Sequence, residues 1–289
     1  MQGKYVLITG GTGGIGKQTA IGLAKLGAHV IVNGRNQARG EQAVREIQQI
    51  TGNRNVDLLI GDMAEQEAVH QVAATYQQRY PRLDVLINNA GLMPSTRQLT
   101  HDGLESAFAV NVVAPYLLTM LLKDMLSVSR PARVIHVAGG LPIGKIDLEN
   151  LQSEKKFSVF NTYSHTKRAM LALSLAQVRH FQKEGITVNV AYPGRAETEM
   201  TKELQVPAIF KVIGVVTERF TLKGEETVIR AARCSIYLAS SPEVEDVSGA
   251  FFNPNTKQGR WIKAAQDEAT QNHLWSLLEE VTTKTAQPA

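Results

Sequence analysis

The sequence predicts a single α/β domain built on a doubly wound parallel sheet, the Rossmann arrangement. Three observations lead to this prediction. Short apolar segments alternate with helical patterns along nearly the whole chain, and most of these segments are apolar on both faces, as strands covered by helices on both sides require. Near the amino terminus, an apolar segment runs into a glycine cluster and then into a helical pattern that begins near Ile15. We find no internal repeat and no low-complexity linker, so we expect residues 1–289 to form one domain.

The expected strands are short apolar runs bounded by turn residues. The first ends at the glycine cluster, the second begins after Gly27, and the third follows Thr51-Gly52. The last two lie after Gly185 and Gly249, late in the chain. The predicted strands cover residues 5–9, 29–33, 56–60, 85–88, 133–137, 187–191 and 250–252.

The expected helices occupy the intervals between these strands. Glycine closes the first, second and fifth helices, and Pro81 stops the third because proline cannot continue a helix. The predicted helices cover residues 15–26, 37–50, 65–80, 103–126, 162–183 and 267–281.

Two connections interrupt this alternation. Residues 141–160 are polar and follow the fifth strand, whereas residues 195–220 follow the sixth strand and carry apolar side chains such as Phe210. In open parallel sheets, ligands bind beyond the carboxyl ends of the strands. We therefore expect both segments to form walls of a substrate site, with residues 195–220 as a substrate-binding insertion. An ordinary surface loop and a packing helix remain the alternative.

The composition excludes several classes of protein. The chain is 43% hydrophobic and 20% charged, with a net charge of +4 and no run of basic residues, which disfavours both disorder and nucleic-acid binding. Cys234 is the single cysteine, which suits a reducing compartment. We see no targeting segment and no apolar stretch long enough to span a bilayer, so we expect a cytoplasmic protein without a bound metal.

The glycine cluster is typical of a dinucleotide-binding turn. Gly11, Gly13 and Gly16 match the pattern G-x-G-x-x-G, which lets the backbone approach a pyrophosphate at a helix amino terminus. A P-loop is one alternative, because the segment from Gly11 to Lys17 also reads G-x-x-x-x-G-K. However, Gln18 stands where a P-loop places a hydroxyl. A simple tight turn is the other alternative.

The end of the second strand bears on the choice of cofactor. Arg35 lies about twenty residues beyond the glycine turn, where an NAD-binding protein usually has an acidic residue and an arginine suits a 2′-phosphate. The sequence therefore favours NADP(H), with a solvated surface arginine as the alternative.

Tyr163 and Lys167 form a candidate acid–base pair. A spacing of four residues places both side chains on one helix face. A phenol holds its proton too tightly for catalysis at neutral pH, and a neighbouring ammonium stabilises the phenolate and lowers its pKa. The same spacing also occurs on ordinary surface helices.

Taken together, these motifs resemble the classical short-chain dehydrogenase/reductase family across nearly the whole chain. Within the family, LDVLINNAG, FAVNVVAPYLLT and the SGAFF…LWSLLEE ending look most like the retinol-dehydrogenase branch. The motifs occur in the expected order: TGGTGGIG, Asn88-Asn89-Ala90-Gly91, Asn111, Tyr163-x-x-x-Lys167 and Pro193-Gly194-x-x-x-Thr198.

The resemblance implies roles for individual residues. Tyr163, Lys167 and Asn111 would be catalytic, with Asn111 holding a water that relays protons. Asp62 and Met63 would flank the adenine, and Thr198 would hold the nicotinamide carboxamide. The cofactor-binding residues implied in this way are Gly10, Thr12, Gly14, Ile15, Gly16, Arg35, Asp62, Met63, Asn88, Asn89, Ala90, Gly91, Tyr163, Lys167, Pro193, Gly194 and Thr198.

One departure from the family pattern concerns the catalytic serine, which follows the fifth strand. Ala138 and Gly139 occupy the two serine positions here. Loss of one positioned donor typically costs on the order of 10²–10³ in rate, about 3–4 kcal/mol. His136, Thr162 or a substrate hydroxyl could replace the donor, or Tyr163 and the cofactor could suffice.

The function expected from the resemblance is NADP(H)-dependent reduction of a carbonyl, or oxidation of the matching alcohol, on a lipophilic small molecule. A homodimer or homotetramer is also expected from the resemblance. The alternative is a protein with little dehydrogenase activity that binds NADP(H) as a sensor or scaffold, or that uses Tyr163 for non-redox acid–base chemistry.

Overall fold

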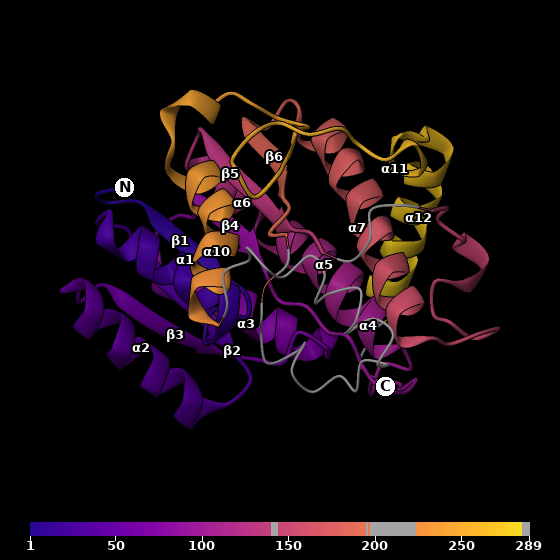
Figure 1. Ribbon diagram of the computed structural model, residues 1–289, viewed down its shortest axis with the longest axis horizontal. Coiled ribbons are helices and arrows are strands. Elements are labelled where there is room, and N and C mark those ends of the chain that lie inside the picture. Colours follow the sequence, from indigo (N-terminus) through magenta and orange to yellow (C-terminus); the bar gives the residue numbers. More distant parts are fainter. Residues whose placement is uncertain (140–143, 195, 197–223, 285–289) are drawn as a thin grey trace.

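A seven-stranded parallel sheet forms the centre of the molecule, with strand order β3-β2-β1-β4-β5-β6-β7 (Figure 1). The computed structural model describes residues 1–139, 144–194, 196 and 224–284. The order reverses between β1 and β4, so the carboxyl ends of these two strands flank the crevice in which open sheets bind ligands. The strands are β1 Tyr5–Ile8, β2 His29–Gly34, β3 Val56–Ile60, β4 Val85–Asn88, β5 Ala132–Val137, β6 Ile186–Ala191 and β7 Phe251–Phe252.

Helices cover both faces of the sheet, as predicted. On one face, α1 (Gly14–Lys25), α2 (Gln37–Thr51) and α10 (Glu225–Ser240) pack against strand residues such as Val6 and Ile8. On the other face, α3 (Gln66–Arg79), α5 (Ala114–Leu121), α6 (Lys123–Val128) and α7 (Val159–Phe181) pack against residues such as Leu7. The alternation of Val6, Leu7 and Ile8 between two cores explains why the first strand is apolar throughout.

The helix predicted at residues 103–126 is divided into shorter elements. These are α4 (Ser106–Phe108), the π-helical turn η1 (Ala109–Val113), α5 and α6. Pro115 lies in the first turn of α5, where its missing N–H is tolerated, and this favours an interruption just before it. Asn111 occupies the π-helical turn, a distortion that often marks functional sites.

Helix α10 was not predicted from the sequence. It begins with Glu225 and Glu226, whose charges suit a helix amino terminus, and it buries Cys234 and Leu238 against α1 and the sheet. Two short 3₁₀ turns, η2 (Leu148–Asn150) and η4 (Pro242–Val244), complete the connections that the structure describes after β5.

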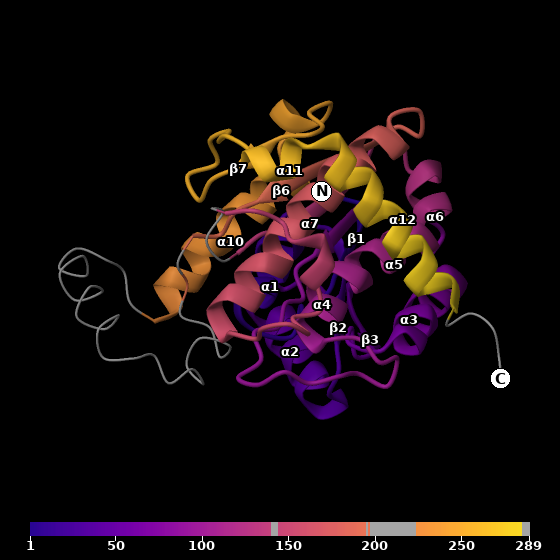
Figure 2. The same ribbon diagram turned by 90° about the vertical axis from the view of Figure 1, so that its right-hand side faces the viewer.

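The last helix, α12 (Glu268–Lys284), follows the short α11 (Lys263–Gln266) and runs alongside α7 in both ribbon views (Figures 1 and 2). Leu274, Trp275 and Leu278 of α12 are buried against α5 and α7. Trp275 stacks on His180, with ring centres 3.6 Å apart. The carboxyl-terminal helix therefore covers the outer surface of α7.

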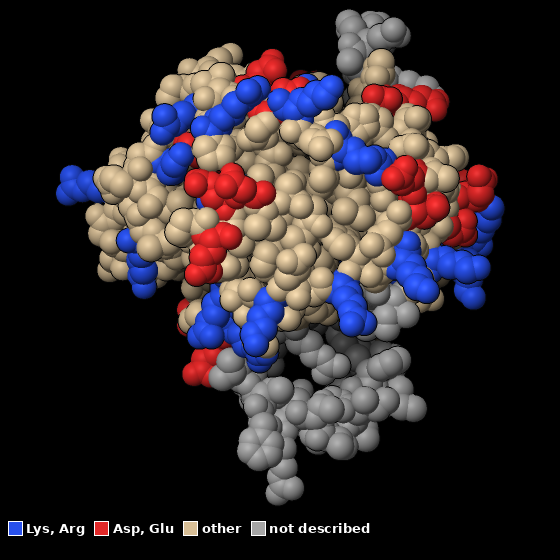
Figure 3. Space-filling model, turned by 90° about the horizontal axis from the view of Figure 1, so that it is seen from above, with Lys and Arg blue, Asp and Glu red and all other residues tan. Residues whose placement is uncertain are grey.

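Two further features concern membrane-spanning helices and the distribution of surface charge. No helix in the described part of the chain is long and apolar enough to cross a membrane. On the face seen in Figure 3, basic and acidic side chains are interspersed rather than gathered into a field of one sign.

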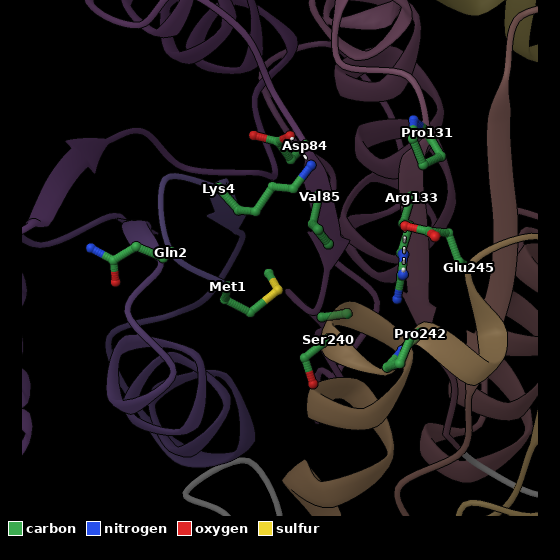
Figure 4. A pocket seen from close by; sticks show the side chains of 11 residues that line it. Met1, Gln2, Lys4, Asp84, Val85, Pro131, Arg133, Ser240, Pro242 and Glu245 are labelled. Atoms are coloured by element: carbon green, nitrogen blue, oxygen red, sulfur yellow. Dashed lines mark hydrogen bonds and ion pairs between the residues drawn. The ribbon is translucent and has the colours of Figure 1, made fainter.

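A pocket opens at the amino-terminal ends of β1, β4 and β5 (Figure 4). Its lining includes the Lys4–Asp84 ion pair (2.9 Å) and Arg133, whose guanidinium donates to the carbonyl oxygens of Leu238 and Ser241. This pocket lies at the sheet edge opposite the glycine turn, so it is separate from the predicted site.

Candidate active site

The glycine turn between β1 and α1 has the geometry of an anion-binding site. Gly10 has a φ of +61°, a conformation that favours glycine. A Cβ atom at Gly16 would lie only 2.3 Å from the carbonyl oxygen of Gly10, so no side chain fits there. Gly13 provides the amino-terminal cap of α1, whose first turn, including Ile15, has no acidic residue. Backbone N–H groups at this terminus are therefore available to a phosphate.

Arg35 lies just beyond β2, at the same edge of the sheet. Its side chain is 74% exposed, and Nη1 lies 3.7 Å from Oδ2 of Asp62, the residue predicted to flank the adenine. Gly34 lies directly against Thr12, because a Cβ at Gly34 would be 2.6 Å from Thr12 Cγ2. The end of β2 and the glycine turn are therefore in contact, and Met63, which follows Asp62 in the chain, is buried.

A second arginine near this turn was missed in the sequence. Arg39 lies in the first turn of α2, where Asn36 caps the helix, and one of its guanidinium nitrogens would be 3.4 Å from a Cβ at Gly13. The sequence signal was available, because Arg39 follows Arg35 by only four residues. Arg35 and Arg39 thus place two positive charges beside the glycine turn.

The end of β4 is tied to the glycine turn by hydrogen bonds. The side-chain amide of Asn89 donates to the carbonyl oxygens of Thr9 (2.9 Å) and Gly10 (3.1 Å). The Thr9 hydroxyl accepts from the backbone N–H groups of Asn89 and Ala90, both at 3.0 Å. Asn88 points away into the core and donates to Thr119. These bonds fix the shape of the crevice between β1 and β4.

Asn111 connects the segment after β4 to α7. Its side-chain Nδ2 donates to the carbonyl oxygen of Leu92 (2.9 Å) and to Thr166 Oγ1 (3.0 Å), and its Oδ1 accepts from the N–H of Leu92 (2.9 Å). The amide is therefore engaged on both of its polar ends. The structure assigns this side chain a positioning contact that the sequence did not predict.

Lys167 lies on α7, inside the carboxyl edge of the sheet. Its Nζ donates to the carbonyl oxygen of Val137 at the end of β5 (3.0 Å) and lies close to Gly91, where a Cβ would be 3.4 Å away. Burial lowers the pKa of Lys167 to about 8. The predicted residues Gly91, Asn111 and Lys167 are thus brought together in one cluster.

Tyr163 lies one turn before Lys167, but its acidity differs from the sequence-based expectation. Burial, followed by repulsion from Tyr192, raises the pKa of Tyr163 to about 12. The Lys167 Nζ lies 6.0 Å from the centre of the phenol ring and is bonded to Val137 instead. The expected lowering of the phenol pKa by the ammonium is therefore wrong for this arrangement.

The residues considered as replacements for the serine hydroxyl point elsewhere. His136 is fully buried and its Nε2 lies 2.6 Å from Oε1 of Gln177 on α7, while burial lowers its pKa to about 4. Thr162 Oγ1 is hydrogen-bonded to Ser153 (2.9 Å) and accepts from the N–H of Ser158 (3.3 Å). Both side chains are thus bonded to other partners, and Gly139 lies beside the phenol of Tyr163.

The segments predicted as substrate walls are only partly described. Pro193 and Gly194 follow β6 at the same sheet edge, whereas Thr198 and nearly all of residues 195–220 lie outside the described residues. In the first segment, the N–H of Asp147 donates to His165 Nε2 (2.9 Å) and Arg168 donates to the carbonyl oxygen of Lys145 (3.0 Å). The described part of that segment is thus attached to α7.

Comparison with known proteins agrees with this geometry. Residues 4–207 match the family model of short chain dehydrogenases. The chain is 37% identical to human retinol dehydrogenase 14 over 96% of its own length and 86% of the relative's. It is 32% identical to human polyprenol dehydrogenase over 96% of its length and 85% of the relative's.

A solved structure supports the fold. The crystal structure of an uncharacterized protein from Mycobacterium Paratuberculosis superposes with a TM-score of 0.77 at 26% identity, covering 98% of this chain and 94% of that one. The chain therefore belongs to the short chain dehydrogenase family of oxidoreductases, and within it to the retinol-dehydrogenase-like branch.

Proposed function

We propose that this protein is an NADP(H)-dependent oxidoreductase that reduces a carbonyl, or oxidises the matching alcohol, on a lipophilic small molecule. The observation that carries the proposal is the placement of Tyr163 and Lys167 on one face of α7, beside the crevice between β1 and β4. The relatives named above take their names from retinol and polyprenol, which are lipophilic alcohols.

The residues at this edge fit a dinucleotide. The amino terminus of α1 presents backbone N–H groups to a pyrophosphate, and Gly16 leaves the space that close approach requires. Arg35 and Arg39 supply guanidinium groups suited to a 2′-phosphate. When bound, the nicotinamide would supply a hydride to the carbonyl carbon. Lys167 would bind the adjoining ribose.

Tyr163, Lys167 and Asn111 would have different roles in the reaction. Tyr163 would give the proton of its Oη to the substrate oxygen during reduction and take it back during oxidation. A turn of the phenol toward the Lys167 ammonium would lower the phenol pKa. Asn111 would hold the segment after β4 against α7 through the hydrogen bonds of its side-chain amide.

Gly139 leaves the substrate oxygen with one donor fewer than a serine would provide. We therefore expect weak turnover of simple carbonyls, on the order of 10²–10³ below that of a serine-bearing site. A substrate with its own hydroxyl next to the carbonyl would be affected least.

The test combines cofactor binding with turnover. NADPH binding is measured by cofactor fluorescence, and reduction is followed with a panel of lipophilic aldehydes and ketones that includes retinal. We expect Tyr163→Phe to abolish reduction while NADPH binding persists, because the phenyl ring has no proton to give. Tyr237→Phe is the matched control, since Tyr237 lies on α10 and donates to Glu243 of η4, away from the crevice.

Two outcomes would contradict the proposal. Unchanged turnover in Tyr163→Phe would remove the assigned proton donor. Tight NADPH binding without turnover by the wild-type protein or by Gly139→Ser would favour the non-redox alternative.

A further inference from the structure

Gly139 touches the tip of the Tyr163 side chain. A Cβ atom added at Gly139 would lie 2.3 Å from Tyr163 Oη, a distance that real Cβ atoms essentially never show, and 3.2 Å from Cζ, which is also a tight contact. The phenol therefore occupies the space in which any other side chain at position 139 would begin. Only glycine at this position is compatible with the observed place of the phenol.

The ammonium of Lys167 does not hold the phenol of Tyr163 in this position. The same added Cβ would be 3.6 Å from Cε of Lys167, so both side chains converge on Gly139, yet the Lys167 ammonium donates to Val137. Among the described residues, the titratable groups facing this place are Lys167 on α7 and Tyr192 after β6. His136 of β5 lies near enough to Lys167 to feel its charge, but it is hydrogen-bonded to Gln177.

We propose that Gly139 is a positioning residue that seats Tyr163 in a retracted resting place, which the phenol must leave to reach a substrate oxygen. Glycine in place of serine at this position thus also leaves space for the phenol of Tyr163. The catalytic part of this inference rests on the proposed function, because it takes Tyr163 as the proton donor. The resting position itself does not depend on it.

The position of the phenol against Gly139 affects the pKa of Tyr163. In the retracted place, burial and Tyr192 raise the pKa of Tyr163 to about 12, so the phenol holds its proton more tightly than tyrosine in water does. A methyl group at position 139 would expel the phenol toward solvent without adding a hydroxyl. Its pKa would then fall toward the ordinary value of about 10.

The first test is a titration that requires neither cofactor nor turnover. Tyrosines labelled with ¹³C at Cζ are followed by NMR against pH in the ligand-free protein, and Tyr163→Phe identifies the resonance among the seven tyrosines of the chain. In Gly139→Ala and Gly139→Ser we expect the Tyr163 midpoint to fall by at least about one pH unit, a tenfold loss of proton affinity. Gly259→Ala, whose Cβ would meet Phe251 rather than Tyr163, is the control and should leave the midpoint unchanged.

The second test measures the pH dependence of kcat for reduction. Once the phenol is unseated, the alkaline limb of the kcat profile for reduction should move to lower pH in Gly139→Ala, with KM little changed. An unchanged Tyr163 midpoint in both variants would overturn the seat, as would an ordinary midpoint near 10 in the wild-type protein. A shifted midpoint with an unchanged kcat profile would overturn the positioning role. A shifted midpoint in a protein that never reduces carbonyls would leave the seat standing and refute the proposed function.

Discussion

Lys167 illustrates, at the scale of a single residue, how a proposed catalytic group conflicts with stability. Its ammonium is buried, and Nζ donates to the carbonyl oxygen of Val137. Burial lowers the pKa of Lys167 from 10.5 to about 8. The unfolded chain therefore binds more protons than the folded protein between these two values, and the folded protein gains stability from this group as the pH rises through that window.

We expect Lys167→Met to have a free energy of unfolding that is higher than that of the wild type at pH 7 by on the order of 1–3 kcal/mol. We also expect the variant to lose turnover. The gain should shrink as the pH rises above about 8, because the wild-type amine then becomes neutral at less cost. Urea unfolding at several pH values measures both effects. Lys156→Met, at an exposed position, is the control. A Lys167→Met protein that is less stable than the wild type at pH 7 would contradict this account.

At the scale of elements, the contact between the glycine turn and the β2–α2 connection determines the charge offered to a cofactor. Gly34 packs on Thr12, and this close contact brings Arg35 and Arg39 to the same side of the turn as the amino terminus of α1. One guanidinium comes from the end of a strand and the other from the first turn of a helix. Under the proposed function, the choice between NADP(H) and NAD(H) would depend on how these two elements pack.

We expect Arg39→Ala and Arg35→Ala each to weaken NADPH binding about ten- to a hundredfold, which corresponds to the loss of one charge-assisted hydrogen bond, while NADH binding changes little. Cofactor fluorescence titrations give both affinities. Arg45→Ala is the matched control. Arg45 also lies on α2, but it lies away from the glycine turn and pairs with Glu41, with Nη1 3.9 Å from Oε2. Equal losses for NADPH and NADH would show that the two arginines do not read the 2′-phosphate.

At the scale of the whole molecule, α12 determines which surfaces are open. Leu274, Trp275 and Leu278 pack on α5 and α7, and Trp275 also meets the ring of Tyr116 edge to face, with centres 5.1 Å apart. The homodimer or homotetramer expected from the long helices stays a prediction. Any such contact must use α12 itself or another face, because α12 lies on α7.

We expect Trp275→Ala to destabilise the protein by about 3–5 kcal/mol, as for other buried tryptophans, and to promote self-association by loosening α12. Urea unfolding and light scattering after size-exclusion chromatography measure the two effects. His273→Ala, at an exposed position of the same helix, should behave like the wild type. A Trp275→Ala protein of unchanged stability would show that α12 contributes little to the fold.

The sequence was sufficient where the determining signal is local. The alternation of strands and helices, the glycine turn and the pairing of Tyr163 with Lys167 all follow from periodicity and spacing within one or two elements. The division of the predicted helix at residues 103–126 was missed because a π-helical turn changes the backbone without changing the apolar pattern. Helix α10 was missed although its acidic first turn is a recognisable signal.

The fold, the family and the residue types at the carboxyl edge of the sheet could all be predicted from the amino-acid sequence. The contacts of His136 with Gln177, of Arg39 with Gly13 and of the Tyr163 phenol with Gly139 could be found only in the folded structure. They could not be predicted because they join segments that are distant in the chain. Their geometry depends on how helices pack on the sheet, and burial at those contacts then sets the acidity of Tyr163 and Lys167.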